Sequence, residues 1–198
     1  MKKAILISGG IDSIALTYWI RPAIGITLDY GQLAAQTETQ AAAQVCRELE
    51  IEHIALKIDC SKLGSCDLAG GSPLSVAPVS EWWPYRNQLL VTLAGAALLQ
   101  HGVGQILLGT VASDASHADG TPVFIEALSA LMQLQEGHMS VAAPAIELSS
   151  VALVQTSEIP IELLSWAHSC HVSNFACGRC RGCLKHYTTM RDLGFKAY

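Results

Sequence analysis

Short apolar runs alternate with longer segments of helical character through the first 110 residues. The runs lie at residues 3–8, 23–29, 52–59 and 105–110. Between them, helices are predicted from Asp12 onward and over residues 37–49 and 86–100. Brief apolar runs that end in turn residues are typical of buried strands. Strands that alternate with helices predict an α/β fold with a parallel sheet covered on both faces.

The second half of the chain has a less regular pattern. Residues 60–83 are rich in Gly, Ser and Pro, which predicts a long loop, and loops of this length are commonly functional. A polar loop at 113–120 precedes a helix at 122–135, in which Pro122 occupies a favoured first position. A fifth strand at 141–144, short helices at 149–156 and 161–166, an irregular stretch at 170–183 and a closing helix at 184–193 follow.

Length, charge and hydropathy narrow the class of protein. A chain of 198 residues with 51% hydrophobic residues can bury one sizeable core. Its net charge of −5 favours a small-molecule substrate over a nucleic acid, because nucleic-acid binders usually carry a basic face. The N-terminus lacks a signal-peptide pattern, and the apolar stretch 89–99 is about half of a membrane span. We therefore expect a cytoplasmic protein without a membrane partner.

The glycine turn after the first strand is the strongest candidate for chemistry. Residues 8–13 read SGGIDS. Gly9 and Gly10 permit a sharp turn beside the first N–H groups of a helix, which suits a phosphate group. Ser8 and Ser13 could donate hydroxyl hydrogen bonds to that phosphate, and Asp12 could hold Mg²⁺. No Walker A lysine follows. The alternative is a simple strand-to-helix turn capped by Asp12 or Ser8.

Four of the seven cysteines cluster near the C-terminus. Cys170, Cys177, Cys180 and Cys183 have the spacing C-x6-C-x2-C-x2-C, which predicts a closed, structural Zn²⁺ site. An iron–sulfur cluster and four unligated thiols are the alternatives. The odd number of cysteines and the absent signal peptide argue against a disulfide framework. His168 and His171 flank the first cysteine and could substitute as ligands.

Several segments together resemble one enzyme family along nearly the whole chain. The hexapeptide SGGIDS is similar to the SGGxDS motif of the PP-loop ATP pyrophosphatases. The segments that resemble the 7-cyano-7-deazaguanine synthase (QueC) family are that hexapeptide, 28–32 (LDYGQ), 85–87 (YRN), the loop 109–119, 164–170 (LSWAHSC) and the four cysteines. We interpret the chain as a divergent QueC-like member.

The resemblance implies both a fold and a reaction. The fold would be a Rossmann-like five-stranded parallel sheet in the order 3-2-1-4-5, with a PP-loop domain at 1–166 and a zinc-binding segment at 167–198 packed on it. The enzyme would use ATP to adenylate the carboxylate of 7-carboxy-7-deazaguanine. Ammonia would then give an amide, which a second ATP would convert to the nitrile. A homodimer is also expected.

The same resemblance assigns site residues. Catalytic roles fall to Asp12, Ser13 and Arg86. ATP would be bound by Ser8, Gly9, Gly10, Asp12, Ser13 and Gln32. The substrate would be bound by Arg86, Asn87, Asp114, Ser116 and Asp119. Two simpler interpretations stay open, namely that Arg86 and Asn87 only open a helix and that Asp114 and Asp119 are ordinary turn residues.

The departures from the family pattern leave the acceptor open. Ser150 stands where the family has a lysine near the ATP phosphates, and Leu33-Ala34-Ala35 replaces basic residues after DYGQ. The substrate loop has also lost its aromatic residues. Another cation or a partner would have to supply the missing charge, or the activity is altered. The alternatives are transfer to a protein amine in an anti-phage system, an inactive nucleotide-binding module, and a tRNA-thiolating enzyme.

Overall fold

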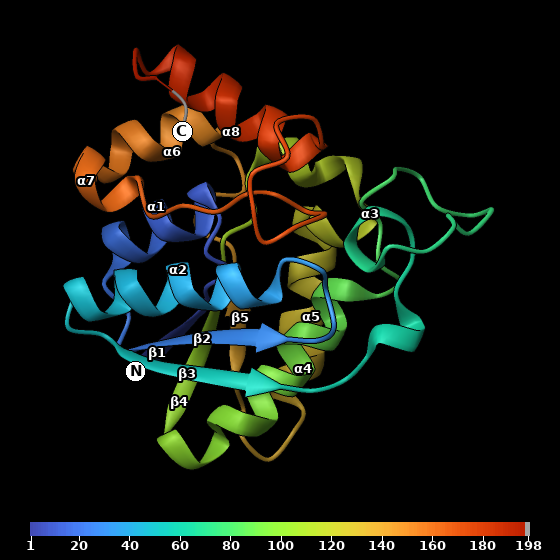
Figure 1. Cartoon of the computed structure of the whole chain (residues 1–198). Coiled ribbons are helices and arrows are strands. Elements are labelled where there is room, and N and C mark those ends of the chain that lie inside the picture. Colours follow the sequence, from blue (N-terminus) through green and yellow to red (C-terminus); the bar gives the residue numbers. More distant parts are fainter. Residues whose placement is uncertain (197–198) are drawn as a thin grey trace.

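A five-stranded parallel sheet forms the centre of the computed structural model, which describes residues 1–196 (Figure 1). The strands are β1 (Lys2–Leu6), β2 (Ile24–Asp29), β3 (Glu52–Lys57), β4 (Val103–Leu108) and β5 (Ser140–Ala142). Their order is β3-β2-β1-β4-β5, and every neighbouring pair is parallel. The predicted fold class and strand order are therefore confirmed.

Helices cover both faces of this sheet. They are α1 (Ile11–Ile20), α2 (Ala35–Glu48), α3 (Cys66–Ala69), α4 (Arg86–Leu98), α5 (Pro122–Gln133), α6 (Ser150–Ser157), α7 (Ile161–Leu164) and α8 (Arg181–Asp192). Figure 1 shows α1, α2, α6, α7 and α8 on one side and α4 and α5 on the other. Among the described helices, none has the length and apolar character that crossing a bilayer requires.

Two separate apolar clusters form because successive strand side chains point to opposite faces. Ile5 and Ile7 belong to the cluster under α1 and α2, whereas Ala4 and Leu6 belong to the cluster under α4 and α5. Leu107 belongs to the first cluster, and its neighbours in β4 belong to the second. Burial on both faces explains why the strands are continuous apolar runs in the sequence.

Three segments differ from their predicted structure. The predicted loop 60–83 contains two short helices, η1 (Ser61–Leu63) and α3, and the polar loop 113–120 contains η3 (Ala112–Ser116) and η4 (Ala118–Gly120). The closing helix begins at Arg181, not at residue 184, because the Cys180 sulfur accepts a hydrogen bond from the Cys183 N–H and caps the helix. Cys183 thus lies in the first turn of α8.

The C-terminal segment packs against the glycine turn and the long loop. The His168 N–H donates to the Gly9 carbonyl at 2.8 Å, and α8 packs against α6. The buried Glu81 carboxylate, at the end of the 60–83 loop, accepts from the Arg181 guanidinium at 2.9 Å. Residues from both ends of the chain therefore surround the carboxyl edge of the sheet.

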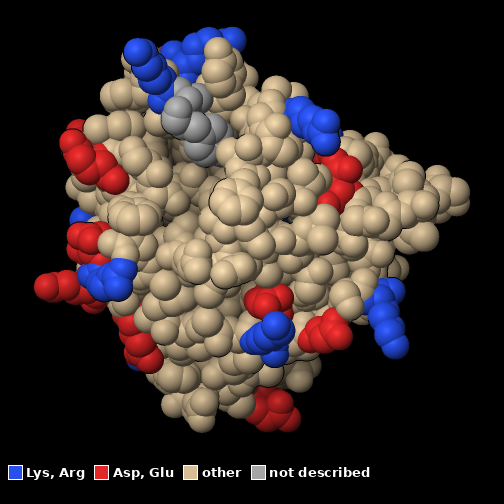
Figure 2. Space-filling model, viewed as in Figure 1, with Lys and Arg blue, Asp and Glu red and all other residues tan. Residues whose placement is uncertain are grey.

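Charged side chains are dispersed over the described surface in the view of Figure 2. Lys and Arg alternate there with Asp and Glu among many uncharged residues, and the described residues form no continuous basic surface on that face. This distribution agrees with the net charge of −5.

Candidate functional site

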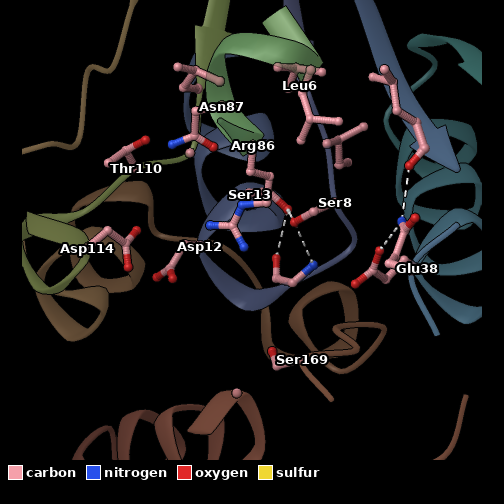
Figure 3. A pocket seen from close by; sticks show the side chains of 18 of the residues that line it. Leu6, Ser8, Asp12, Ser13, Glu38, Arg86, Asn87, Thr110, Asp114 and Ser169 are labelled. Atoms are coloured by element: carbon pink, nitrogen blue, oxygen red, sulfur yellow. Dashed lines mark hydrogen bonds between the residues drawn. The ribbon is translucent and has the colours of Figure 1, made fainter. Parts of the chain in front are cut away.

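An open cavity of about 260 Å³ lies at the carboxyl edge of the sheet. It is lined by the ends of β1, β2 and β4, the starts of α1 and α4, the loop after β4, and the C-terminal segment (Figure 3). The chain leaves β1 toward β2 on one side and later returns to β4 on the other, so this edge is a topological switch point. Ligands of open α/β sheets bind at such points.

The glycine turn forms one wall of the cavity. Gly9 has φ of +74°, and a β-carbon there would lie 2.5 Å from the Glu38 carbonyl oxygen, so only glycine fits. The N-cap residue of α1 is Gly10, which has no side chain to cap the helix, and the nearest side-chain acceptor in the turn is Ser8 Oγ, which accepts a long hydrogen bond from the Gly10 N–H at 3.4 Å. Gly10, Asp12 and Ser13 line the cavity, whereas Gly9 packs behind it. A helix start with glycine as its N-cap residue, beside a cavity, is suited to an anion.

The two serines of the turn hydrogen-bond to each other. The Ser8 hydroxyl donates to Ser13 Oγ at 3.2 Å, and the Ser13 hydroxyl donates to the Gly10 carbonyl at 2.9 Å (Figure 3). The Ser13 side chain is buried, while Ser8 is exposed. These bonds hold the turn in shape, and the Ser8 hydroxyl can rotate toward a ligand.

Lys185 of α8 reaches into this cavity and joins two carboxylates. Its Nζ lies 2.7 Å from Asp12 Oδ2 and 3.2 Å from Asp114 Oδ1. Burial lowers the pKa of Lys185, but the two carboxylates outweigh burial and the net pKa is raised. The other oxygen, Asp12 Oδ1, is buried and has no hydrogen-bond partner within the described chain. A divalent cation such as Mg²⁺ fits this orphaned oxygen.

Sequence reasoning missed Lys185. The sequence shows Lys185 only as a basic residue two positions after Cys183. The direction of the Lys185 side chain depends on where helix α8 begins, which the sequence pattern did not show. Ser150, which stands at the family's lysine position, is buried at the start of α6 and does not line the cavity. Among the described residues that line the cavity, Arg86 is the single arginine and Lys185 the single lysine.

The start of α4 is tied to the loop after β4. The Asn87 N–H donates to Asp119 Oδ2 at 3.1 Å, and its side-chain amide donates to the Asp119 carbonyl at 2.8 Å. Arg86 lines the cavity near Tyr30, whose pKa is raised by burial despite the opposing effect of Arg86. Asn87 and Asp119 also line the cavity, so any substrate contact by these residues competes with their mutual bonds.

The loop 109–120 brings only part of its predicted residues to the cavity. Asp114 lines it, with Oδ2 accepting from the Val111 N–H at 3.1 Å and Oδ1 facing Lys185. Ser116 is exposed, donates to the Ser113 carbonyl at 3.4 Å, and lies outside the lining. Substrate recognition by Ser116 would therefore need the loop to move.

Gln32 positions the half-buried carboxylate of Glu38, which was not predicted. The Gln32 oxygen accepts from the Tyr30 N–H at 2.9 Å, and its amide donates to the Leu28 carbonyl at 3.1 Å and to Glu38 Oε2 at 2.8 Å. Burial raises the pKa of Glu38 to about 7, although Gln32 and Arg86 oppose this. Because its amide is engaged within the chain, Gln32 acts on a ligand mainly through Glu38, which lines the cavity (Figure 3).

The four cysteines form a cage that fits zinc. All four sulfurs lie within 4.8 Å of one another, and no other described His, Cys, Asp or Glu joins this group. The Cys177–Cys183 and Cys180–Cys170 sulfur distances are 3.9 and 4.0 Å. A tetrahedron with Zn–S bonds of about 2.3 Å has edges of about 3.8 Å. The site therefore suits a closed, structural Zn²⁺, and the flanking His168 and His171 lie outside this group of ligand atoms.

The backbone around the cage favours thiolates. N–H groups of Cys180 and Cys183 donate to Cys177 and Cys180 sulfurs at 3.3 and 3.4 Å. Backbone N–H groups of Arg179 and Cys180 lower the pKa of Cys177 to about 6, whereas burial raises the pKa of Cys183 to about 12. Burial also raises the pKa of Cys170. A bound cation would stabilise all four thiolates.

The cysteine cage lies directly behind the cavity wall. Gly182 and His171 line the cavity, and a β-carbon at Gly182 would collide with the Ser169 carbonyl and lie 2.6 Å from His171 Nε2. Burial and Arg86 lower the pKa of His171 to about 4. Ser169 Oγ accepts from the Ile11 N–H at 3.5 Å, and this contact joins the wall to the glycine turn. The cage thus holds one wall of the cavity in place.

Comparison with known proteins gives one family and a consistent set of relatives. The matching family model is described as "Queuosine biosynthesis protein QueC" and covers residues 2–198. A Methanosarcina mazei protein named 7-cyano-7-deazaguanine synthase is 27% identical over 99% of this chain and 96% of its own length. A Desulforudis audaxviator protein of the same name is 31% identical over 98% of each chain.

Proposed function

The chain belongs to the QueC family, and from this membership we propose that it is an ATP-dependent ligase acting on a deazaguanine carboxylate. The observation that carries the proposal is the glycine turn before α1, whose N-cap Gly10 has no side chain and which lines a cavity at the switch point of the sheet. We propose 7-carboxy-7-deazaguanine as substrate, ammonia as nitrogen donor and 7-cyano-7-deazaguanine as product.

The first step is adenylation of the carboxylate. A carboxylate oxygen attacks the α-phosphorus of ATP, and the bond from that phosphorus to the bridging oxygen breaks as pyrophosphate leaves. The glycine turn and the start of α1 hold the phosphates, while Arg86, which enters the cavity from α4, faces the anionic reactants. Holding both anions in line is the main contribution the site can make.

Nitrogen then replaces oxygen in two stages. Ammonia attacks the carbonyl carbon, AMP leaves and one proton is lost, which gives an amide. The amide oxygen attacks a second ATP, pyrophosphate leaves again, and loss of AMP with two protons forms the nitrile. Glu38, whose pKa of about 7 lies near neutrality, lines the cavity and is suited to accept one of these protons.

Two metal ions fit the described residues. Mg²⁺ would be held by Asp12, whose buried Oδ1 lacks a partner, and would neutralise phosphate charge. Zn²⁺ would be held by the four cysteines and would stabilise the C-terminal segment.

The test uses the full chain with ATP, Mg²⁺, ammonium and 7-carboxy-7-deazaguanine. We expect pyrophosphate release that depends on the carboxylate, and conversion of the carboxylate to the nitrile by mass spectrometry. Omission of ammonium should leave the acyl adenylate and its hydrolysis products. Absence of carboxylate-dependent pyrophosphate release from zinc-loaded protein would refute the proposal. Release without nitrile, with a mass increase on an added protein amine, would indicate the protein-acceptor alternative.

A further inference from the structure

Lys185 lies at the junction of the two parts of the cavity that would hold the two reactants. Asp12 belongs to the glycine turn, where the phosphates are proposed to bind, and Asp114 belongs to the loop after β4. Figure 3 shows the carboxylates of Asp12 and Asp114 side by side at the cavity. The Lys185 ammonium group contacts both, at 2.7 and 3.2 Å.

We propose that Lys185 is a further catalytic residue, whose ammonium group binds an oxygen of the α-phosphate while the substrate carboxylate attacks. This inference rests on the proposed function. In the step, a carboxylate oxygen–phosphorus bond forms and the bond to the pyrophosphate oxygen breaks. Lys185 keeps its proton throughout and offsets the negative charge that builds on the phosphate oxygens.

The hydrogen-bonding capacity of Lys185 supports this role. An ammonium group has three N–H donors, and the two carboxylates take two of them. One donor is left for a ligand oxygen. The Lys185 side chain is 32% exposed and lines the cavity, so a ligand can reach it.

The charge balance of the cavity also requires a cation at this position. Asp12 and Asp114 would otherwise place two carboxylates beside the site proposed for a triphosphate. Arg86, the other Arg or Lys among the described lining residues, enters from α4 near Tyr30 and Glu38. Lys185 is therefore the side-chain cation that lies closest to the charge at the glycine turn, and it would act together with the Mg²⁺ proposed for Asp12.

The first turn of α8 fixes the direction of Lys185. Cys180 caps the helix, and Arg181 pairs with the buried Glu81 at 2.9 Å. Gly182 packs so closely on Ser169 and His171 that no β-carbon fits. The helix therefore cannot rotate freely about its axis, and Lys185 stays aimed at Asp12.

The test compares Lys185→Met with Lys185→Arg and with the matched control Lys57→Met. Lys57 is on β3, its side chain is 81% exposed, and it lies outside the cavity. Carboxylate-dependent exchange of labelled pyrophosphate into ATP reports adenylation alone. We expect Lys185→Met to lower the maximal exchange rate by about 100-fold, the cost of removing one such donor. Lys185→Arg should recover part of that loss, and Lys57→Met should exchange like the wild type.

Zinc content and the thermal unfolding midpoint show whether each variant keeps its fold. Exchange by Lys185→Met within about threefold of the wild type, well below the effect of a lost charge-stabilising donor, would overturn the inference. Loss of zinc or of the unfolding transition would assign Lys185 to the fold and also overturn it.

ATP affinity separates failure of the inference from failure of the proposed function. If the wild type shows no exchange, the proposed function fails, and titration calorimetry with ATP then decides the role of Lys185. A loss of affinity of about tenfold in Lys185→Met, as expected for a charged hydrogen bond, would support a phosphate contact. Equal affinity, or no ATP binding by the wild type, would overturn it.

Discussion

Glu38→Gln tests how much the ionised Glu38 carboxylate, which accepts a hydrogen bond from Gln32 in the cavity, lowers the free energy of unfolding. Burial raises the pKa of Glu38 from 4.5 to about 7. The folded protein therefore binds more protons than the unfolded chain between these pH values, and its stability falls as pH rises through that window. At pH 8 the cost is at most about 3.5 kcal/mol, because the pKa rises by about 2.5 units and one pKa unit corresponds to about 1.4 kcal/mol.

The expected result is a difference between the variants that depends on pH. Gln at position 38 keeps an acceptor for the Gln32 amide but cannot ionise. We expect Glu38→Gln to be more stable than the wild type at pH 8 by up to about 3.5 kcal/mol, and to lose this advantage near pH 4.5. Other titrating groups are common to both proteins and cancel in the difference.

Urea unfolding of both zinc-loaded proteins at several pH values between 4.5 and 8 measures this difference. A difference in unfolding free energy that stays constant over the range would refute the raised pKa. A wild type that gains stability relative to Glu38→Gln as pH rises would show that Arg86 governs Glu38 and that burial does not.

Three further predictions concern the glycine turn and the cysteine cage. Asp12→Ala should abolish pyrophosphate release while keeping the thermal midpoint within a few degrees; unchanged turnover would exclude the assigned role. Gly9→Ala should lower the unfolding free energy by at least about 1 kcal/mol in urea titrations, because its φ is +74° and the Glu38 carbonyl is 2.5 Å from the new β-carbon. Full stability would mean that the turn can shift. Cys180→Ser should lose bound zinc by elemental analysis and expose the C-terminal segment to proteolysis, because the serine hydroxyl can still cap α8 but cannot replace the thiolate ligand; retained zinc would contradict a four-sulfur cage.

Short sequence patterns were enough to predict the strands, the glycine turn and the cysteine cage, because each of these depends mainly on residues that are close together in the chain. Ile5 and Ile7 with Ala4 and Leu6 form a run that is buried on both faces, so strand β1 was evident. The paired glycines predicted the glycine turn, and the spacing of the four cysteines predicted the cage. The strand order followed only from the family resemblance, because apolar runs do not specify which neighbours pair.

Side chains whose position depends on tertiary packing could not be predicted. Lys185 enters the cavity because α8 begins at Arg181 and Gly182 packs against Ser169, and neither contact is visible in the sequence pattern. Glu38 looked like one of several polar residues on an Ala-rich helix until Gln32 was seen to hold it. Ser116 matched a family motif, yet the tight turn of η3 leaves it exposed.

The hydrogen bond from His168 to Gly9 has a consequence for synthesis of the chain on the ribosome. Gly9 emerges long before its partner His168, and β4, which pairs with β1, begins only at Val103. Such distant pairings delay folding. The glycine turn therefore acquires its full surroundings only after residue 168 has left the ribosome, and a nascent chain would be unable to consume ATP before then.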